Sequence, residues 1–183
     1  MKLELVKMLF DDETNLGASH ILGCPDVPSS WNDEAIFFND EVFLGQINLS
    51  ETSIPSLPSE GILYFFIAAL STPYRGIVRY AKDLSDLERI DFNEESPLKF
   101  DYSLEYAVEF KAEDGDVTLM GKMPKFKGYK PLPNEVCLLK LDLSNYKEVE
   151  LFKDLIDPIC FIIKKEDLEN QNFEKAYLAN TLN

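Results

Sequence analysis

The segment from Leu98 to Phe110 alternates between apolar and polar side chains, and no other feature of the sequence constrains the fold as strongly. Every even position is apolar, while the odd positions include Glu105 and Glu109. Successive side chains of a β-strand point to opposite faces of a sheet, so the pattern predicts a strand with one buried face and one wet, acidic face. Strands of this kind are typical of antiparallel sheets.

Four further segments carry strand signals. Two nearly continuous apolar runs, at 42–49 and 61–69, are bounded by turn residues and predict strands that are buried on both faces. Residues 2–5 alternate briefly in the manner of a strand, and residues 76–80 follow the turn at Pro73 with mainly apolar side chains. The chain is therefore expected to be rich in strands.

Helical signals are few and short. Residues 82–89 predict one or two helical turns with two leucines facing inward. Residues 164–168 and 172–177 predict short helical turns near the end of the chain. Residues 113–116 contain an Asp-Gly pair between alternating segments, which predicts a hairpin loop.

These patterns predict the fold class and the number of domains. A length of 183 residues favours a single domain, over residues 1–183. We expect an α+β protein that is mainly antiparallel β, with short helices at its periphery. Because 45% of the residues are apolar, the formal charge of −15 is expected on a folded surface and not in a disordered tail.

The N-terminal segment and the cysteines predict where the protein resides. The first residues mix acidic and basic side chains with apolar ones, unlike a signal peptide, and no stretch approaches the ~20 apolar residues of a membrane helix. Cys24, Cys137 and Cys160 form no paired motif, which predicts reduced, largely buried thiols. We therefore expect a soluble cytoplasmic protein.

Residues 19–80 and 117–178 present the same order of features. Each half has a glycine-containing turn followed by two apolar runs, and Gly23 and Gly121 are 98 positions apart, while the apolar runs are offset by 94 and 96. A near-constant offset predicts two weakly repeated β-rich halves that pack as one domain. Chance similarity between buried strands is the alternative.

The first half also carries motifs that resemble a known family. Residues 22–28 read Leu-Gly-Cys-Pro-Asp-Val-Pro, residues 43–49 read Phe-Leu-Gly-Gln-Ile-Asn-Leu, and residues 57–66 read Leu-Pro-Ser-Glu-Gly-Ile-Leu-Tyr-Phe-Phe. These runs closely resemble the YwqG-like family of bacterial proteins, which are built round a domain of unknown function. The second half is similar too, with Lys140 where the family has glutamine. The resemblance implies one YwqG-like domain, and families like this one include immunity proteins against polymorphic toxins.

Catalytic motifs are weak. His20 is the single histidine and lies four residues before Cys24, but Gly23 and Pro25 disfavour a helix that would bring the two side chains together. We expect His20 to be partly buried beside a turn. One histidine and scattered cysteines predict no metal site, and the absence of a glycine-rich phosphate-binding loop predicts no nucleotide cofactor. The sequence thus predicts no catalytic residues.

Adjacent acidic residues are the remaining catalytic option. They occur at 11–13, 33–34, 40–41 and 94–95. Neighbouring side chains in a strand point to opposite faces, so none of these groups is poised for acid–base chemistry. We predict that all four are solvated surface.

Two further residues join His20 as candidate binding residues. Gln46 places an amide inside an apolar run, so we expect it to hydrogen-bond the backbone of a neighbouring loop, with ligand contact as the alternative. Trp31 follows two prolines in a predicted loop, where it either covers the end of the sheet or lines an exposed groove.

The charge separates the classes of partner. With 33 Asp and Glu against 18 Lys and Arg, the chain is unsuited to nucleic acid or an anionic membrane and complements a basic protein. We therefore predict a non-enzymatic, acidic protein-binding module, with an immunity protein that neutralises a basic toxin as its specific form. The alternative is a small-molecule or peptide-binding domain, or a minor enzyme, with a cleft between the two halves near Trp31, Gln46 and His20.

Overall fold

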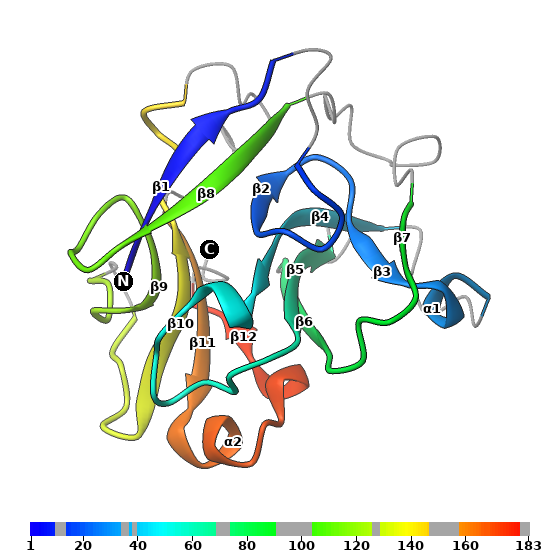
Figure 1. Ribbon diagram of the computed structural model, residues 1–183. Coiled ribbons are helices and arrows are strands. Elements are labelled where there is room, and N and C mark those ends of the chain that lie inside the picture. Colours follow the sequence, from blue (N-terminus) through cyan, green and yellow to red (C-terminus); the bar gives the residue numbers. More distant parts are fainter. Residues whose placement is uncertain are drawn as a thin grey trace.

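The computed structural model describes residues 1–9, 14–33, 37, 40–68, 74–90, 104–125, 129–146 and 158–179. Most of the strands belong to one ten-stranded sheet (Figure 1). In chain order they are β1 (Lys2–Lys7), β2 (His20–Leu22), β4 (Glu41–Asn48), β5 (Ile62–Ala68), β6 (Arg75–Ala81), β8 (Glu105–Lys111), β9 (Val117–Gly121), β10 (Glu135–Leu141), β11 (Ile159–Lys164) and β12 (Tyr177–Leu178). In space the order is β12-β11-β10-β9-β1-β8-β2-β4-β5-β6, and neighbouring strands are antiparallel.

Two more strands and several short helices lie outside this sheet. Strand β3 (Asp26–Pro28) pairs with β7 (Leu87–Arg89) in a separate two-stranded sheet. Helix α1 (Ser29–Asp33) follows β3, and α2 (Lys165–Glu169) follows β11. Single 3-10 turns, η1 (Leu49–Glu51) and η3 (Phe173–Lys175), follow β4 and precede β12.

The predicted antiparallel, strand-rich fold is confirmed. Strands form at 2–7, 41–48, 62–68 and 75–81, close to the ranges that the sequence indicates. The α-helices of the described residues have only five residues each, so "mainly antiparallel β" fits the fold better than α+β. In the described part of the chain, no helix has the length and apolar character needed to cross a membrane.

The large sheet curls until its edge strands, β6 and β12, contact each other. At this seam a Cβ atom built on Gly76 would lie 2.8 Å from side-chain atoms of both Leu178 and Phe161. Figure 1 shows β9, β10 and β11 on one side of the molecule and β4, β5 and β6 on the other. The main apolar core fills the interior, where the ring centroids of Phe65 and Phe161 lie 5.1 Å apart.

Strands β4 and β5 are buried on both faces, as their apolar runs predict. All of β5 and all but the last residue of β4 are buried. One face belongs to the main core. The other forms a second apolar cluster in which Phe43, Tyr64 and Phe66 pack with Val27 of β3. The layer that contains β3 therefore explains why these strands lack a polar face.

The alternating segment forms β8 over its second half, and residues 98–103 lie outside the described residues. Tyr106 is buried and Glu109 is exposed, as the alternation predicts. The prediction for Glu105 is wrong, because this residue is buried. Strand β2 pairs with this part of β8. The Glu105 carboxylate accepts a hydrogen bond of 2.8 Å from the backbone N–H of Thr14. The segment before β2 thus covers the Glu105 carboxylate, which the alternating pattern predicts to be exposed to solvent.

The helix predicted over 82–89 is also wrong. This segment turns at Asp83, whose Oδ1 accepts a hydrogen bond from the Ser85 backbone N–H at 3.0 Å, and then forms β7. The backbone of β3 is available as a pairing partner, and the N–H of Ile90 extends the contact to the carbonyl of Pro25 at 3.1 Å. The two leucines still pack against the second apolar cluster, so their spacing indicated burial and not helical periodicity.

Residues 113–116 form a loop as predicted, but the loop does not close a hairpin. Strand β1 lies between the strands on either side of it, so that Lys2 pairs with both Lys111 of β8 and Thr118 of β9. An Asp-Gly turn signal is local and carries no information about a strand inserted from elsewhere in the chain. The helical turns predicted near the C-terminus are confirmed as α2 and η3.

Candidate functional site

A buried polar network centred on Asp26 joins the large sheet to β3 and β7. Asp26 begins β3 and has no exposed surface. Its carboxylate accepts hydrogen bonds from the Gly17 backbone N–H at 2.8 Å, from Gln46 Nε2 at 3.0 Å and from Arg89 Nε at 2.7 Å. The Tyr64 hydroxyl donates to the Asp26 carbonyl at 2.6 Å. Each hydrogen bond links Asp26 to a different segment, so the network fixes how these segments meet.

Gln46 binds backbone groups, as its place inside an apolar strand predicts. Its Oε1 accepts a hydrogen bond from the Asp26 backbone N–H at 2.8 Å, and its Nε2 donates to the Ala18 carbonyl at 2.8 Å. The side chain is fully buried. Its amide is therefore satisfied by the protein itself.

His20 lies opposite Gln46 in the pairing of β2 with β4, and it is fully buried rather than partly buried beside a turn. Its Nδ1 donates to the Leu22 carbonyl at 2.8 Å, which leaves Nε2 as the acceptor nitrogen. Nε2 lies 4.0 Å from Asp26 Oδ2 and has no hydrogen-bond partner among the described residues.

Burial lowers the pKa of His20, although the carboxylates of Glu105 and Asp26 oppose the shift. The imidazole is thus neutral at physiological pH. A neutral ring without exposed surface has no route to a substrate, so His20 serves the packing of β2 and not proton transfer.

Trp31 lies apart from His20 and Gln46, on α1. It is half-buried and packs edge-on against Tyr64, with ring centroids 5.2 Å apart. It also lines an open pocket of about 400 Å³. The residues around this pocket are Pro28, Ser29, Ser30, Trp31, Tyr80, Ala81, Lys82, Asp83, Ser85 and Asp86. Of the three candidate binding residues, the structure brings His20 and Gln46 together, and Tyr64 connects them to Trp31.

The adjacent acidic residues give one clear outcome. Glu41 was predicted to be solvated, and this is wrong: it is buried and binds Arg79 through two hydrogen bonds of 2.6 and 2.8 Å. The Arg79 guanidinium also lies 5.0 Å from the ring centroids of Phe37 and Phe66. The pairs or triplets at 11–13, 33–34 and 94–95 lie wholly or partly outside the described residues.

Sequence reasoning missed the buried ionic groups. Asp26 and Arg89 are 63 positions apart, and their pairing depends on the contact between β3 and β7. Glu135 is likewise buried and accepts hydrogen bonds from the hydroxyls of Tyr129 and Tyr177 at 3.0 and 2.5 Å. No local pattern marks these carboxylates as buried, because their partners come from other segments.

The cysteine thiols are largely shielded from solvent. Cys137 and Cys160 are buried and Cys24 is half-buried, which confirms the prediction of largely buried thiols. A hydrogen bond with Cys137 and burial raise the pKa of Cys160, so its thiol stays protonated. Among the described residues, no three His, Cys, Asp or Glu side chains gather in a way that would hold a metal ion.

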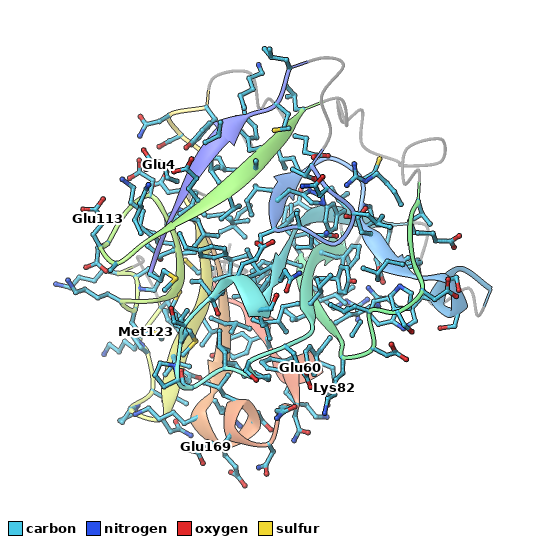
Figure 2. All side chains as sticks on the ribbon, viewed as in Figure 1. Glu4, Glu60, Lys82, Glu113, Met123 and Glu169 are labelled. Atoms are coloured by element: carbon cyan, nitrogen blue, oxygen red, sulfur yellow. The ribbon has the colours of Figure 1, made fainter. Side chains whose placement is uncertain are left out.

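Exposed carboxylates near β1 and β8 are balanced by lysines. Glu4 and Glu109 face each other across the two strands, and Lys111 Nζ lies 3.7 Å from the first and 2.8 Å from the second. Glu113 pairs with Lys2 at 3.3 Å. Asp114 also pairs with a lysine, Lys122. Figure 2 shows Glu4 and Glu113 together at the outer margin of the molecule.

The carboxylates at the pocket beside Trp31 have different partners. Asp83 accepts a hydrogen bond from the Ser85 backbone N–H, and Asp86 accepts one from the Ser29 hydroxyl. Within the described ranges, neither aspartate has an ion pair with a lysine or arginine. These two exposed carboxylates are thus available to a cation from outside the chain.

The residues that resemble the YwqG-like family occupy structural positions in this fold. Gly23 takes a positive φ of 72° in the turn after β2, and Gln46 anchors the polar network. These residues therefore have structural roles in this chain, and those roles assign no activity. Comparison of the chain with models of known protein families and with curated proteins finds no match, so the YwqG-like assignment remains a prediction.

Proposed function

We propose that this protein is a non-enzymatic binding module for a basic protein. The observation that carries the proposal is the division of its polar groups between interior and surface. Among the described residues, three groups of the kinds that enzymes use, His20, Asp26 and Glu105, are buried and hydrogen-bonded within the protein. Exposed carboxylates, by contrast, are spread over the described surface, as at Glu60, Asp83 and Glu169.

A formal charge of −15 gives this surface a physical use. A negative field attracts a cationic partner during diffusion and raises the association rate. Complementary charges also exclude partners of the wrong sign. The acidic surface therefore favours a basic protein over nucleic acid, whose phosphates it repels.

The specific form of this proposal is a bacterial, cytoplasmic immunity protein of the YwqG-like family that neutralises a basic toxin. The resemblance of residues 22–28, 43–49 and 57–66 to that family supports it. An acidic inhibitor can cover the cationic, phosphate-binding active site of a nuclease with its carboxylates. No covalent chemistry is required of such an inhibitor, in agreement with the burial of His20.

Affinity capture tests the proposal. The full chain, immobilised through a terminal tag, is exposed to an extract of its native cell at low salt, and retained proteins are identified by mass spectrometry. We expect one stoichiometric basic protein, whose binding is reproduced with purified components and weakens with salt. Retention of no basic protein at low salt would contradict the proposal.

A peptide- or small-molecule-binding domain is the second candidate function. The pocket of about 400 Å³ beside Trp31 favours it, since its size falls within the range of small-ligand sites. The lining residues of this pocket lie between positions 28 and 86, so residues 117–178 contribute none of them and the pocket is not the predicted cleft between the two halves. If capture fails, a screen of small ligands by the emission of Trp31, the single tryptophan, becomes the direct test.

We also propose that residues 19–80 and 117–178 are two related halves of one domain. Support comes first from irregular backbone at matched positions. Leu22 and Met120, 98 positions apart, both have a positive φ although neither is glycine. The pairing of β4 with β5 shifts register between Phe43 and Gly45, and that of β10 with β11 shifts between Cys137 and Leu139.

Hydrogen bonds at matched positions support the same relation. Gln46 Nε2 donates to the Ala18 carbonyl before β2, and Lys140 Nζ donates to the Gly115 carbonyl before β9, at 2.8 and 2.7 Å. Asn48, the last residue of β4, and Asp142, the residue after β10, each accept hydrogen bonds from a serine two residues further along the chain. An experimental structure in which the two ranges fail to superpose, strand on strand, would contradict the proposal.

A further inference from the structure

We propose that the pocket beside Trp31 is a binding site for a guanidinium group, and that it receives an arginine side chain of the basic partner. This inference rests on the proposed function and adds to it a place and a chemistry. The pocket lies between α1 and the segment that links β6 to β7. It is open to solvent on the surface of the second apolar cluster.

One aromatic side chain, Trp31, lines the pocket, and other contacts hold it in place. Trp31 packs against Tyr64 and also against Phe37, at 5.2 and 6.3 Å between centroids. The Tyr80 side chain lies on the opposite face of the sheet, where it packs against Phe173 of the main core at 5.2 Å. A ring that is already fixed loses little conformational freedom when a ligand enters. Planar guanidinium groups stack on such rings.

Two carboxylates give the pocket its charge. Asp83 and Asp86 are exposed at the rim, and each is oriented by a hydrogen bond from a serine. Hydrogen bonds from Ser85 lower the pKa of Asp83, so it is ionised at physiological pH. Lys82, the cation among the lining residues, has its Nζ 3.6 Å from Glu60 Oε1, and Figure 2 shows the two side chains next to each other.

The combination selects one class of occupant. A neutral or anionic ligand gains nothing from two aspartates. A metal ion would gain nothing from the Trp31 ring. An arginine satisfies both features, because its face can lie on an aromatic ring while its N–H groups donate to carboxylate oxygens. A basic partner with an arginine at the centre of its contact surface therefore fits this part of the module.

The emission of Trp31 reports on the pocket directly, because the chain has a single tryptophan. The intact protein is titrated with acetyl-Gly-Arg-Gly-amide and, in parallel, with the same peptide carrying citrulline, which is neutral and nearly isosteric with arginine. The double variant D83N/D86N removes the two negative charges and keeps one acceptor oxygen at each position. The matched control E113Q/D114N removes the same charge from the lysine-paired loop.

We expect the arginine peptide to change the emission saturably and the citrulline peptide to bind about tenfold more weakly. D83N/D86N should weaken arginine binding by about fivefold or more, while the control stays within about twofold. Equal binding of the two peptides, equal losses in the two double variants, or no change in emission at millimolar peptide would overturn the proposal.

This outcome is separable from that of the proposed function. Capture of a basic protein whose binding tolerates D83N/D86N would leave the binding module intact and remove the pocket from it. Arginine binding in the pocket, together with failure to capture any basic protein, would support the guanidinium site and contradict the proposed binding module. Circular dichroism and urea unfolding of both double variants verify that each is folded.

Discussion

Buried carboxylates show how single residues hold this fold together. Asp26 and Glu41 each face an arginine, and Glu135 faces two tyrosine hydroxyls. A buried charge is tolerated only when its desolvation is offset by such partners. Each carboxylate joins segments that are distant in sequence, so its contribution is lost when either side changes.

Replacement of Asp26 by asparagine should lower the free energy of unfolding by about 3 kcal/mol, because it removes the buried carboxylate that pairs with the partly buried Arg89. Urea unfolding followed by circular dichroism measures the change. The exposed Glu109→Gln variant is the control and should leave the midpoint nearly unchanged. Similar midpoints for the two variants would show that the network around Asp26 does not stabilise the protein.

His20 makes stability depend on pH in a defined direction. Burial lowers its pKa in the folded protein, whereas the unfolded chain has the ordinary value of 6.5. Below pH 6.5 the unfolded state therefore binds the proton more readily. The contribution of His20 to the free energy of unfolding is fully present above pH 6.5. Below pH 6.5 the free energy of unfolding falls by up to about 1.4 kcal/mol per pH unit, until the pH reaches the pKa of His20 in the folded protein.

Nuclear magnetic resonance measures this directly, since the ring signals of the single histidine are unambiguous. The signals should keep their neutral positions well below pH 6.5 for as long as the protein is folded. Titration of the folded ring at or above pH 6.5 would contradict the burial of His20. The non-titrating His20→Gln variant should lose less stability than the parent chain between neutral pH and pH 5.

At the scale of elements, the sequence predicts those strands whose burial is uniform or strictly alternating. The runs at 42–49 and 61–69 became β4 and β5 because both of their faces are covered. The strand β7 was missed because three residues are too few for a period, and because its pairing partner β3 lies sixty positions earlier. The hairpin at 113–116 failed for the same reason, since β1 enters from the far end of the chain.

The candidate site was predictable only in part. Gln46 stood out as an amide in an apolar run, and its backbone contacts followed. Its partner Asp26 does not stand out in the sequence, because a single acidic residue between two prolines is typical of a turn. The pocket beside Trp31 combines α1 with the segment after β6, and no spacing in the sequence brings these together.

The register shift in β4 gives a test at this scale. A Cβ atom at Gly45 would lie 2.8 Å from the His20 carbonyl oxygen and 3.1 Å from the Ile21 Cα, so Gly45→Ala must push β2 away from β4. We expect a loss of about 2 kcal/mol or more in unfolding free energy. Gly115→Ala is the control, because the three heavy atoms nearest to its Cβ all belong to the flexible side chain of Lys2 and none to the backbone. Equal stability of the two variants would contradict the close approach of β2 to β4.

Over the whole molecule, the exposed carboxylates behind the formal charge of −15 differ in their partners. Some exposed carboxylates, such as Glu109 and Glu113, are paired with lysines on neighbouring strands or loops. Asp83 and Asp86 accept hydrogen bonds from serines and lie beside the Trp31 side chain. The overall field would attract a basic partner, and the pocket would give that partner a fixed point of attachment.

The dependence of the association rate constant on ionic strength tests whether the acidic surface binds a basic protein. Stopped-flow mixing of the intact protein with its captured partner, followed by Trp31 emission, gives the association and dissociation rate constants separately. Electrostatic steering predicts that the association rate constant falls by about tenfold or more between roughly 0.05 and 0.5 M NaCl, while the dissociation rate constant changes much less. An association rate constant that does not change with salt would show that the acidic surface does not attract the partner.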